Sequence, residues 1–219
     1  MERVAVITWN IGGMDPERII PKQSVRYDRY YVTDQNIPYP FPLLDNRMKA
    51  KYGKIQGHRV YDHDILIWID GNVQITDSKF IEGLCDSLNG FDVAISKHPD
   101  RTDIYQEADY MVSEIRSGNS YLRTRYNWQE VQNEAEHFRS AGHPAKAGLF
   151  WCGLFARVNT PRVNSCFDAW WDDNLKFVNY DQNSFAYEAH RFDLQISIVD
   201  WGQFYKNKHY NLNHHLKLQ

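Results

Sequence analysis

The fold is decided by residues 64–75, which read DILIWIDGNVQI. The five apolar residues in a row, Ile65 to Ile69, are typical of a strand that is buried on both faces, as in a parallel sheet covered by helices. The strand ends in Asp70-Gly71-Asn72, where two oxygen-bearing side chains stand two residues apart. Because ligands bind at the carboxyl ends of the strands in open α/β sheets, this stretch predicts both a central strand and a binding site.

The side chains of Asp70 and Asn72 are of the kind that a hard divalent cation prefers. Mg²⁺ and Mn²⁺ bind in proteins through one or two carboxylates, together with substrate phosphates and waters. We therefore predict that Asp70 and Asn72 hold Mn²⁺ or Mg²⁺ against a phosphate-bearing substrate. Asn72 adds no charge, so such a metal would depend on the substrate for much of its affinity. An ordinary Asp-Gly turn is the competing interpretation.

Length and composition indicate one α/β domain, residues 1–219, with a substantial core, because 42% of the residues are hydrophobic. The formal net charge of −3 gives no general attraction to nucleic acid. The three cysteines, Cys85, Cys152 and Cys166, are widely spaced and are expected to be reduced thiols. No apolar stretch approaches the length of a membrane span and no signal segment is visible. We expect a cytoplasmic protein.

Strand-like and helix-like segments alternate along the chain, which favours a mostly parallel central sheet flanked by helices. Strands are expected at residues 4–9, 27–33, 65–69, 91–95, 148–156 (one strand or a bent pair) and 194–199. Helices are expected to begin near residues 46, 77, 103, 127, 164 and 181. The tail carries His209, His214 and His215 and is expected to be frayed, although one of these histidines could complete a metal site.

Several separate blocks of sequence resemble one family in the right order. The blocks are IWIDGN (67–72), KHPDR (97–101), YQEA (105–108), WW (170–171) and DQNSF (181–185). They resemble the glycosyltransferase-like domain family first described in plant mucilage and pollen proteins, which also has bacterial and phage members. The resemblance spans about residues 49–185. It implies a GT-A-type fold for nucleotide-diphospho-sugars, with Asp70-Gly71-Asn72 in the place of the Asp-x-Asp motif. The chain departs from the family at Tyr180, where an Arg usually precedes the Asp-Gln pair.

The function that this resemblance implies is a metal-dependent hexosyl- or pentosyltransferase, which moves a sugar from a nucleotide-diphosphate donor to an acceptor hydroxyl. The acceptor is left open between a glycan, a protein and a modified base in DNA. Two alternatives also remain open. One is a catalytically inactive module of the same fold that binds nucleotide-sugars or glycans, and the other is a DNA-modifying phage glycosyltransferase. A nucleotidyl or pyrophosphate-cleaving enzyme would need a Gly-rich phosphate loop, for which Gly12-Gly13 is too short.

Three further residues are candidates to bind the donor, since a diphosphate leaving group needs cationic partners. Arg101 has a planar fork that matches phosphate oxygens, and His98 and Lys49 are the other two. Each also has an ordinary interpretation. Arg101 could form a surface ion pair with Asp100 or Asp103, and Lys49 and His98 could simply be solvated.

Asp181 is the first candidate for catalysis and Glu107 is the second. The Asp181 carboxylate would take a proton from the acceptor hydroxyl if configuration inverts, or would act at the anomeric carbon if it is retained. A helix N-cap is the competing role for Asp181. Gln182 can bind sugar hydroxyls. Glu107 could equally pair with Arg101.

Two aromatic groups have open interpretations. The tryptophans Trp151, Trp170 and Trp171 could be core residues or a platform for sugar. The segment from Arg116 to Trp128 interleaves three arginines with Tyr121, Tyr126 and Trp128, which could contact a phosphate backbone and stack on bases. A solvated loop between helices explains this segment as well.

Overall fold

The computed structural model describes residues 2–39, 41–213 and 215. The strands are β1 (Val4–Trp9), β2 (Asp28–Val32), β3 (Ile65–Ile69), β4 (Val73–Ile75), β5 (Val93–Lys97), β6 (Phe150–Val158), β7 (Ile196–Ile198) and β8 (Tyr210–Leu212). The helices are α1 (Asn46–Ile55), the 3₁₀ turn η1 (Gly57–Arg59), α2 (Phe80–Ser87), α3 (Ile104–Ser117), α4 (Ser120–Arg123), α5 (Trp128–Ser140), α6 (Pro161–Lys176) and α7 (Asp181–Arg191). None of these helices combines the length and the apolar character that a membrane crossing requires.

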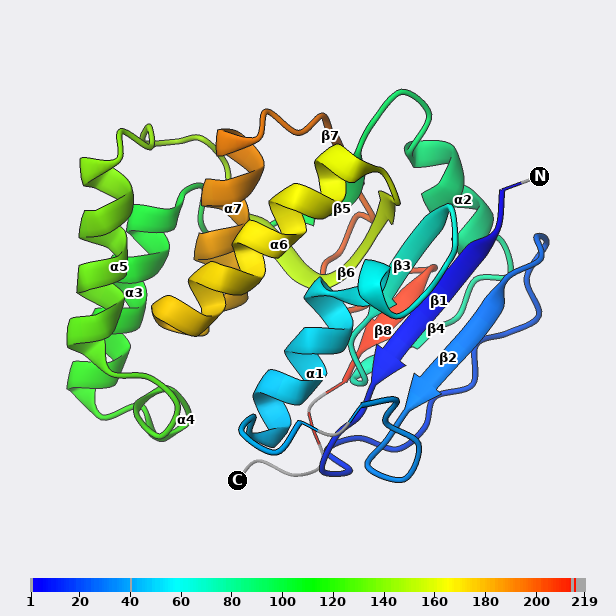
Figure 1. Cartoon of the computed structure of the whole chain (residues 1–219), viewed down its shortest axis with the longest axis horizontal. Coiled ribbons are helices and arrows are strands. Elements are labelled where there is room, and N and C mark those ends of the chain that lie inside the picture. The colour runs from blue at the N-terminus through cyan, green and yellow to red at the C-terminus, as the bar shows by residue number, and fades with distance from the viewer. Residues whose placement is uncertain (1, 40, 214, 216–219) are drawn as a thin grey trace.

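A six-stranded sheet runs through the described residues in the order β2-β1-β3-β6-β5-β7. β1 is parallel to β2 and β3, and β5 is parallel to β7. β6 is antiparallel to both of its neighbours, β3 and β5. The other strands therefore point one way, so that the carboxyl ends of β1, β3 and β5 meet at one edge. The α/β architecture with a mostly parallel sheet and flanking helices is confirmed (Figure 1).

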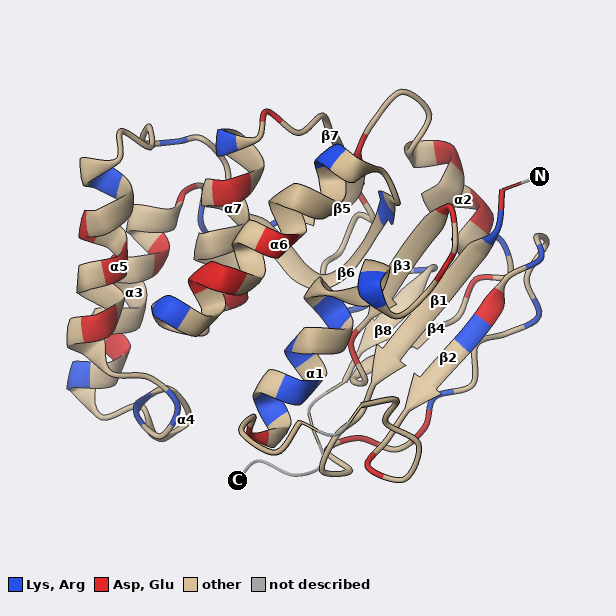
Figure 2. Ribbon diagram, viewed as in Figure 1, with Lys and Arg blue, Asp and Glu red and all other residues tan. Residues whose placement is uncertain are grey.

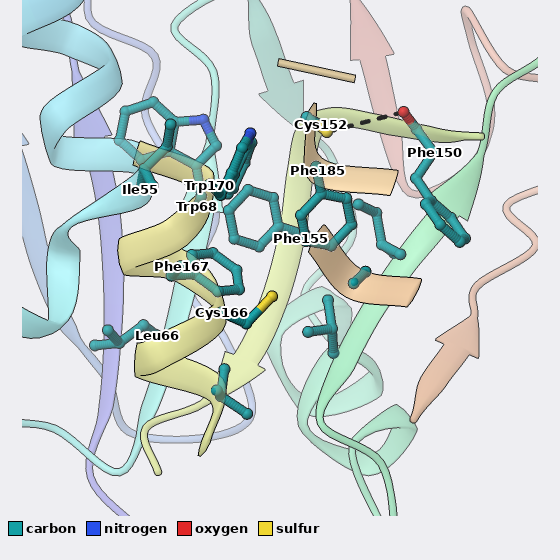
Figure 3. Packing of buried hydrophobic residues seen from close by; sticks show 14 of the residues in the cluster. Ile55, Leu66, Trp68, Phe150, Cys152, Phe155, Cys166, Phe167, Trp170 and Phe185 are labelled. Atoms are coloured by element: carbon teal, nitrogen blue, oxygen red, sulfur yellow. Dashed lines mark hydrogen bonds between the residues drawn. The ribbon is translucent and has the colours of Figure 1, made fainter. Parts of the chain in front are cut away.

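The central strand β3 is buried on both faces, as its sequence predicts, and all five of its residues are buried. Ile65, Ile67 and Ile69 belong to one core cluster, which they share with α2, β4 and β8. Leu66 and Trp68 belong to a second cluster, which they share with α1, α6 and α7. Figure 3 shows this second cluster, in which aromatic rings from β6, α6 and α7 pack together. Helices thus cover one face of the sheet and α2 with the β4–β8 pair covers the other.

A third apolar cluster joins α3, α4 and α5 at the end of the molecule remote from β2 (Figure 1). It is built from Met111 and Ile115 of α3, Leu122 of α4 and Val131 of α5. Asp103 begins α3 as its N-cap and Gly118 ends it at φ 97°, as the sequence predicts. This cluster fixes the position of α4 and of the residues that follow it.

The expectation of a frayed C-terminal tail is wrong for the described part of the tail. β8 pairs antiparallel with β4, so that Tyr210 lies opposite Ile75 and is fully buried. His209 Nδ1 lies 2.7 Å from Asp77 Oδ2. Both strands are only three residues long, and β8 is flanked by polar sequence, so local patterning did not reveal them. His214 lies outside the described residues.

Other element boundaries differ from the sequence prediction. Residues 150–158 form one strand, β6, and not a bent pair. α6 begins at Pro161 after the N-cap Thr160, earlier than the expected residue 164, because proline suits the first turn of a helix. α1 continues to Ile55.

Candidate active site

A cavity of about 760 Å³ lies at the edge of the sheet where β1 and β3 end. The end of β1, the turn after β3 and the start of β6 supply its floor. α1, the segment after α4 and the start of α7 supply its walls. The charged side chains that line it are Asp15, Asp45, Arg47, Lys51, Lys54, Asp70, Arg125, Asp181 and His215. This is the carboxyl edge at which ligands bind in open α/β sheets.

One face of α1 lines the cavity with basic side chains. Arg47, Lys51 and Lys54 are spaced i, i+4 and i+7, which places them in one row along a helix. Figure 2 shows the blue Arg and Lys bands along α1. The Asp45 carboxylate begins the helix by accepting a hydrogen bond from the Met48 amide at 2.7 Å. Lys49 belongs to the same helix, but it does not lie among the residues that line the cavity.

A glycine lets α1 approach the sheet closely enough for this row to reach the cavity. A Cβ on Gly53 would overlap the indole ring of Trp9, the last residue of β1. The helix backbone therefore lies directly against the indole. A larger residue at position 53 would push α1 away from the sheet, and with it the row of basic side chains.

Lys54 bridges two carboxylates from distant parts of the chain. Its Nζ lies 3.1 Å from Asp70 Oδ1 and 2.8 Å from Asp181 Oδ2. Lys51 forms a second ion pair with Asp181. The Asp70 carboxylate also accepts a hydrogen bond from Trp68 Nε1 at 2.5 Å. Burial, together with the charges of Lys54 and Arg47, holds the pKa of Lys51 well below its ordinary value.

The structure places Asp181 in the cavity and directs its carboxylate to these lysines. α7 begins at Asp181 itself, and its N-cap residue is Tyr180. The competing N-cap role for Asp181 is therefore wrong. Asp70 and Asp181, which the sequence places on separate elements, lie on one side of the same cavity.

Asp70 and Asn72, the two predicted metal ligands, lie differently with respect to the cavity, which Asp70 lines. Asn72 is absent from the cavity lining, and its Nδ2 donates to the carbonyl of Asn213 at 3.2 Å. Lys54 Nζ occupies a position beside Asp70 and Asp181 that a bridging cation would need. Within the described ranges, no three or more His, Cys, Asp and Glu side chains are grouped so that they could hold a metal ion. The described residues alone therefore do not complete a metal site, and binding of Mn²⁺ or Mg²⁺ beside Asp70 and Asn72 stays a prediction.

Glu107 lies behind the cavity wall and reaches it through Tyr180. The Glu107 side chain is 1% exposed and accepts a hydrogen bond from the Tyr180 hydroxyl at 2.5 Å. The Gln182 amide donates to the same hydroxyl. Tyr180 and Gln182 line the cavity, whereas Glu107 does not. Burial and the neighbouring Glu107 charge raise the pKa of Tyr180 well above its ordinary value, so the hydroxyl keeps its proton.

Arg101 and His98 lie on the carboxyl side of β5 and are held by Glu107 and by each other. Arg101 Nε donates to Glu107, so its ion pair is with neither Asp100 nor Asp103. His98 Nδ1 accepts hydrogen bonds from the backbone amides of Asp100 and Arg101, at 3.2 and 3.1 Å. Burial lowers the pKa of His98. Neither residue lines the cavity. Their shared role in the structure is to support Glu107, and through it Tyr180.

The three tryptophans divide between the core and the cavity. Trp170 is fully buried among the aromatic residues of Figure 3. Trp171 packs edge-on against Tyr52 with ring centroids 5.4 Å apart. Trp151 lines the cavity. Only Trp151 is therefore placed to meet a ligand.

His215 lines one side of the cavity. His215 Nδ1 lies 2.8 Å from Asp15 Oδ2, and the Asp15 side chain is 3% exposed. Asp15 lies directly against Gly71, where a Cβ would meet its Oδ2 at 3.1 Å. The sequence leaves the C-terminal histidines between a frayed tail and a ligand that completes a metal site. No local signal marks Asp15, because its role depends on the turn after β3.

No curated protein matches the chain. Among solved structures, the chain is similar to the apo form of mouse xyloside xylosyltransferase 1, with 11% identity and a TM-score of 0.42 over 80% of this chain and 63% of that one. It is also similar to the apo structure of the bifunctional glycosyltransferase WbbM, with 11% identity and a TM-score of 0.40 over 90% of this chain and 38% of that one. The chain thus spans less than two thirds of either protein.

The comparison with protein families gives a match over most of the chain. The matching model is described as "TOD1/MUCI70, glycosyltransferase-like domain" and covers residues 30–215. The matched range includes β3, the row of basic residues on α1, Asp181 and His215. The chain belongs to the TOD1/MUCI70 glycosyltransferase-like domain family.

Proposed function

We propose that this protein transfers a hexose or pentose from a nucleotide-diphosphate donor to an acceptor hydroxyl, with the reaction in the cavity at the carboxyl edge of the sheet. One observation carries the proposal: the cavity brings Asp181 and Asp70 together beside a row of basic residues on α1. Family membership supports the same reaction class. The acceptor, whether a glycan, a protein or a modified DNA base, is left open.

Basic residues can stabilise the negative charge that develops on the diphosphate when the donor is cleaved. As the bond between the anomeric carbon and the phosphate oxygen breaks, that bond's electrons pass to the diphosphate. Cationic side chains fixed in a largely buried site stabilise such charge more than water does. The basic side chains that line the cavity are Arg47, Lys51, Lys54 and Arg125.

Asp181 is the residue we propose to act at the sugar. In an inverting reaction its carboxylate takes the proton of the acceptor hydroxyl while the acceptor oxygen bonds to the anomeric carbon. In a retaining reaction it would instead stabilise the developing positive charge or form a covalent intermediate. Its two lysine partners, Lys51 and Lys54, hold the carboxylate in position. Glu107 is the second candidate, and it would act through the Tyr180 hydroxyl.

We propose that Gln182 and Trp151 position the sugar, since an amide can bind sugar hydroxyls and an indole can pack against the face of a sugar.

The three residues that the sequence suggests as donor ligands lie outside the cavity lining; they are Lys49, His98 and Arg101. We assign no step to a metal ion. A requirement for Mn²⁺ or Mg²⁺ stays a prediction, as does a cytoplasmic location.

An assay of donor cleavage tests the proposal. The protein is incubated with a panel of nucleotide-sugars, in parallel with Mn²⁺ and with EDTA, and free nucleoside diphosphate is measured. We expect slow hydrolysis of one donor class by the wild type and loss of that hydrolysis in Asp181→Asn. Donor binding without any cleavage, seen as a thermal shift alone, would instead support an inactive binding module.

A further inference from the structure

Two guanidinium groups in the cavity wall have no acidic partner among the residues that the structure describes. Arg47 lies on α1 and Arg125 lies just after α4, and both line the cavity. In the part of the chain that the structure describes, the Nη1 atoms of both residues are buried and make no hydrogen bond. A buried charged donor without a partner costs free energy, so each such group needs an explanation.

The carboxylates that line the cavity are already engaged. Asp70 and Asp181 pair with Lys54, and Asp181 also pairs with Lys51. Asp15 contacts His215, and Asp45 serves as the N-cap of α1. Among the described residues, no Asp or Glu lies within ion-pair distance of the two arginines. Within the described residues, the pair is therefore left without an acidic partner.

Both guanidinium groups are held in place by aromatic rings. Arg125 stacks over Tyr121 with its Cζ 3.6 Å from the ring centroid, and Arg47 lies 4.9 Å from the centroid of Tyr126. Arg47 Nη2 also donates to Asn179 Oδ1 at 2.5 Å and to the carbonyl of Arg125 at 3.4 Å. These contacts orient the guanidinium planes and leave Nη1 unused. Such preorganisation lowers the cost of ordering the side chains when a ligand binds.

We propose that Arg47 and Arg125 form an oxyanion-binding subsite that takes a phosphate or carboxylate group of the substrate. The planar fork of arginine matches both groups through paired, charge-assisted hydrogen bonds. This inference rests on the proposed function and deepens it, because the oxyanion belongs either to the diphosphate of the donor or to an acidic sugar. It also gives a role to Arg125, Tyr121 and Tyr126, which belong to the segment that the sequence left between a nucleic-acid contact and a solvated loop.

Isothermal titration with two small ligands distinguishes the two sources. Inorganic pyrophosphate represents the diphosphate and D-glucuronate represents an acidic sugar, and each is titrated into the full chain in EDTA. The variants are Arg47→Gln and Arg125→Gln. Arg116→Gln is the matched control, because the Arg116 guanidinium also lies over an aromatic ring, 5.2 Å from the centroid of Trp128, but outside the cavity lining.

We expect each cavity variant to bind one of the two ligands at least about tenfold more weakly than the wild type, since a hydrogen bond to a charged group is lost. Arg116→Gln should bind like the wild type. Loss of pyrophosphate binding assigns the subsite to the donor, and loss of glucuronate binding assigns it to an acidic sugar. Thermal unfolding of each variant checks that the fold is retained.

The subsite is ruled out if the wild type binds neither ligand, or if both cavity variants bind like Arg116→Gln. Donor cleavage separates this failure from that of the proposed function. Cleavage by the wild type that is unaffected by Arg47→Gln and Arg125→Gln would overturn the subsite and leave the transferase intact. Arginine-dependent pyrophosphate binding without cleavage of any donor would support the subsite and overturn the proposed transferase activity.

Discussion

The two sides of the cavity differ in how their charges are satisfied. On one side, Lys51 and Lys54 are paired with Asp181 and Asp70, so the charges cancel within the protein. On the other side, Arg47 and Arg125 are oriented by aromatic rings and retain unused donors. A paired cluster fixes the position of its own members, whereas an unpaired one is ready for a ligand. We infer that the first side carries the chemistry and the second holds the substrate.

The largest effect is expected from Asp181→Asn, which keeps the size of the side chain and removes its basicity. Turnover should fall by about 10²–10⁴-fold, the usual range for loss of a general base. Donor affinity should change little, because a group that acts on the transition state contributes little to ground-state binding. The measurement is the rate of nucleoside diphosphate release. Near-normal turnover would remove Asp181 from catalysis and make Glu107 the better candidate.

The next effect concerns stability and tests whether the lysine side is a true ion-pair cluster. Lys54→Met leaves two carboxylates close together without the cation that bridges them. The free energy of unfolding should fall by about 2–3 kcal/mol, below the range for a fully buried pair because Asp70 is partly exposed. Urea unfolding measures this change.

Lys49→Met is the matched control for Lys54→Met, because it removes a lysine from the same helix outside the cavity. Its effect on the free energy of unfolding should stay within about 0.5 kcal/mol. Equal losses in the two variants would mean that Lys54 contributes only as a helix residue.

A smaller effect separates the two residues that the sequence assigns to a metal. If Mn²⁺ stimulates donor binding, Asp70→Ala should abolish the stimulation, since Asp70 lines the cavity. Asn72→Ala should retain it within about twofold, because the Asn72 amide is turned to the carbonyl of Asn213. Titration of donor with and without Mn²⁺ tests both. Loss of the stimulation in Asn72→Ala would restore the Asp70–Asn72 metal site.

The parts of the site that could be predicted from sequence are those set by local pattern. The apolar run of β3 fixes a buried strand, and the residue after it, Asp70, therefore lies at the sheet edge. Asp181 could be placed because a helix start after a buried segment falls at the same edge. In both cases a single element determines where the side chain lies.

The parts that were missed depend on how separate elements pack. The basic row on α1 is visible in the spacing of Arg47, Lys51 and Lys54, but which side of α1 faces the sheet depends on the contact between Gly53 and Trp9. Because the sequence does not show that orientation, it predicts Lys49 as a donor ligand in place of these three residues. The Tyr180 contact to Glu107 joins α7 to α3, and no periodicity in either helix indicates it.

Steady-state kinetics of donor cleavage by two variants tests the difference between the two sides most directly. We predict that Asp181→Asn lowers kcat and leaves the KM for the donor unchanged. Arg125→Gln should raise the KM for the donor, or the KM for an acidic acceptor, and leave kcat unchanged. A change in the same kinetic parameter in both variants would contradict the inference that one side carries the chemistry and the other binds the substrate. No cleavage of any nucleotide-sugar by the wild type would contradict the proposed transfer reaction itself.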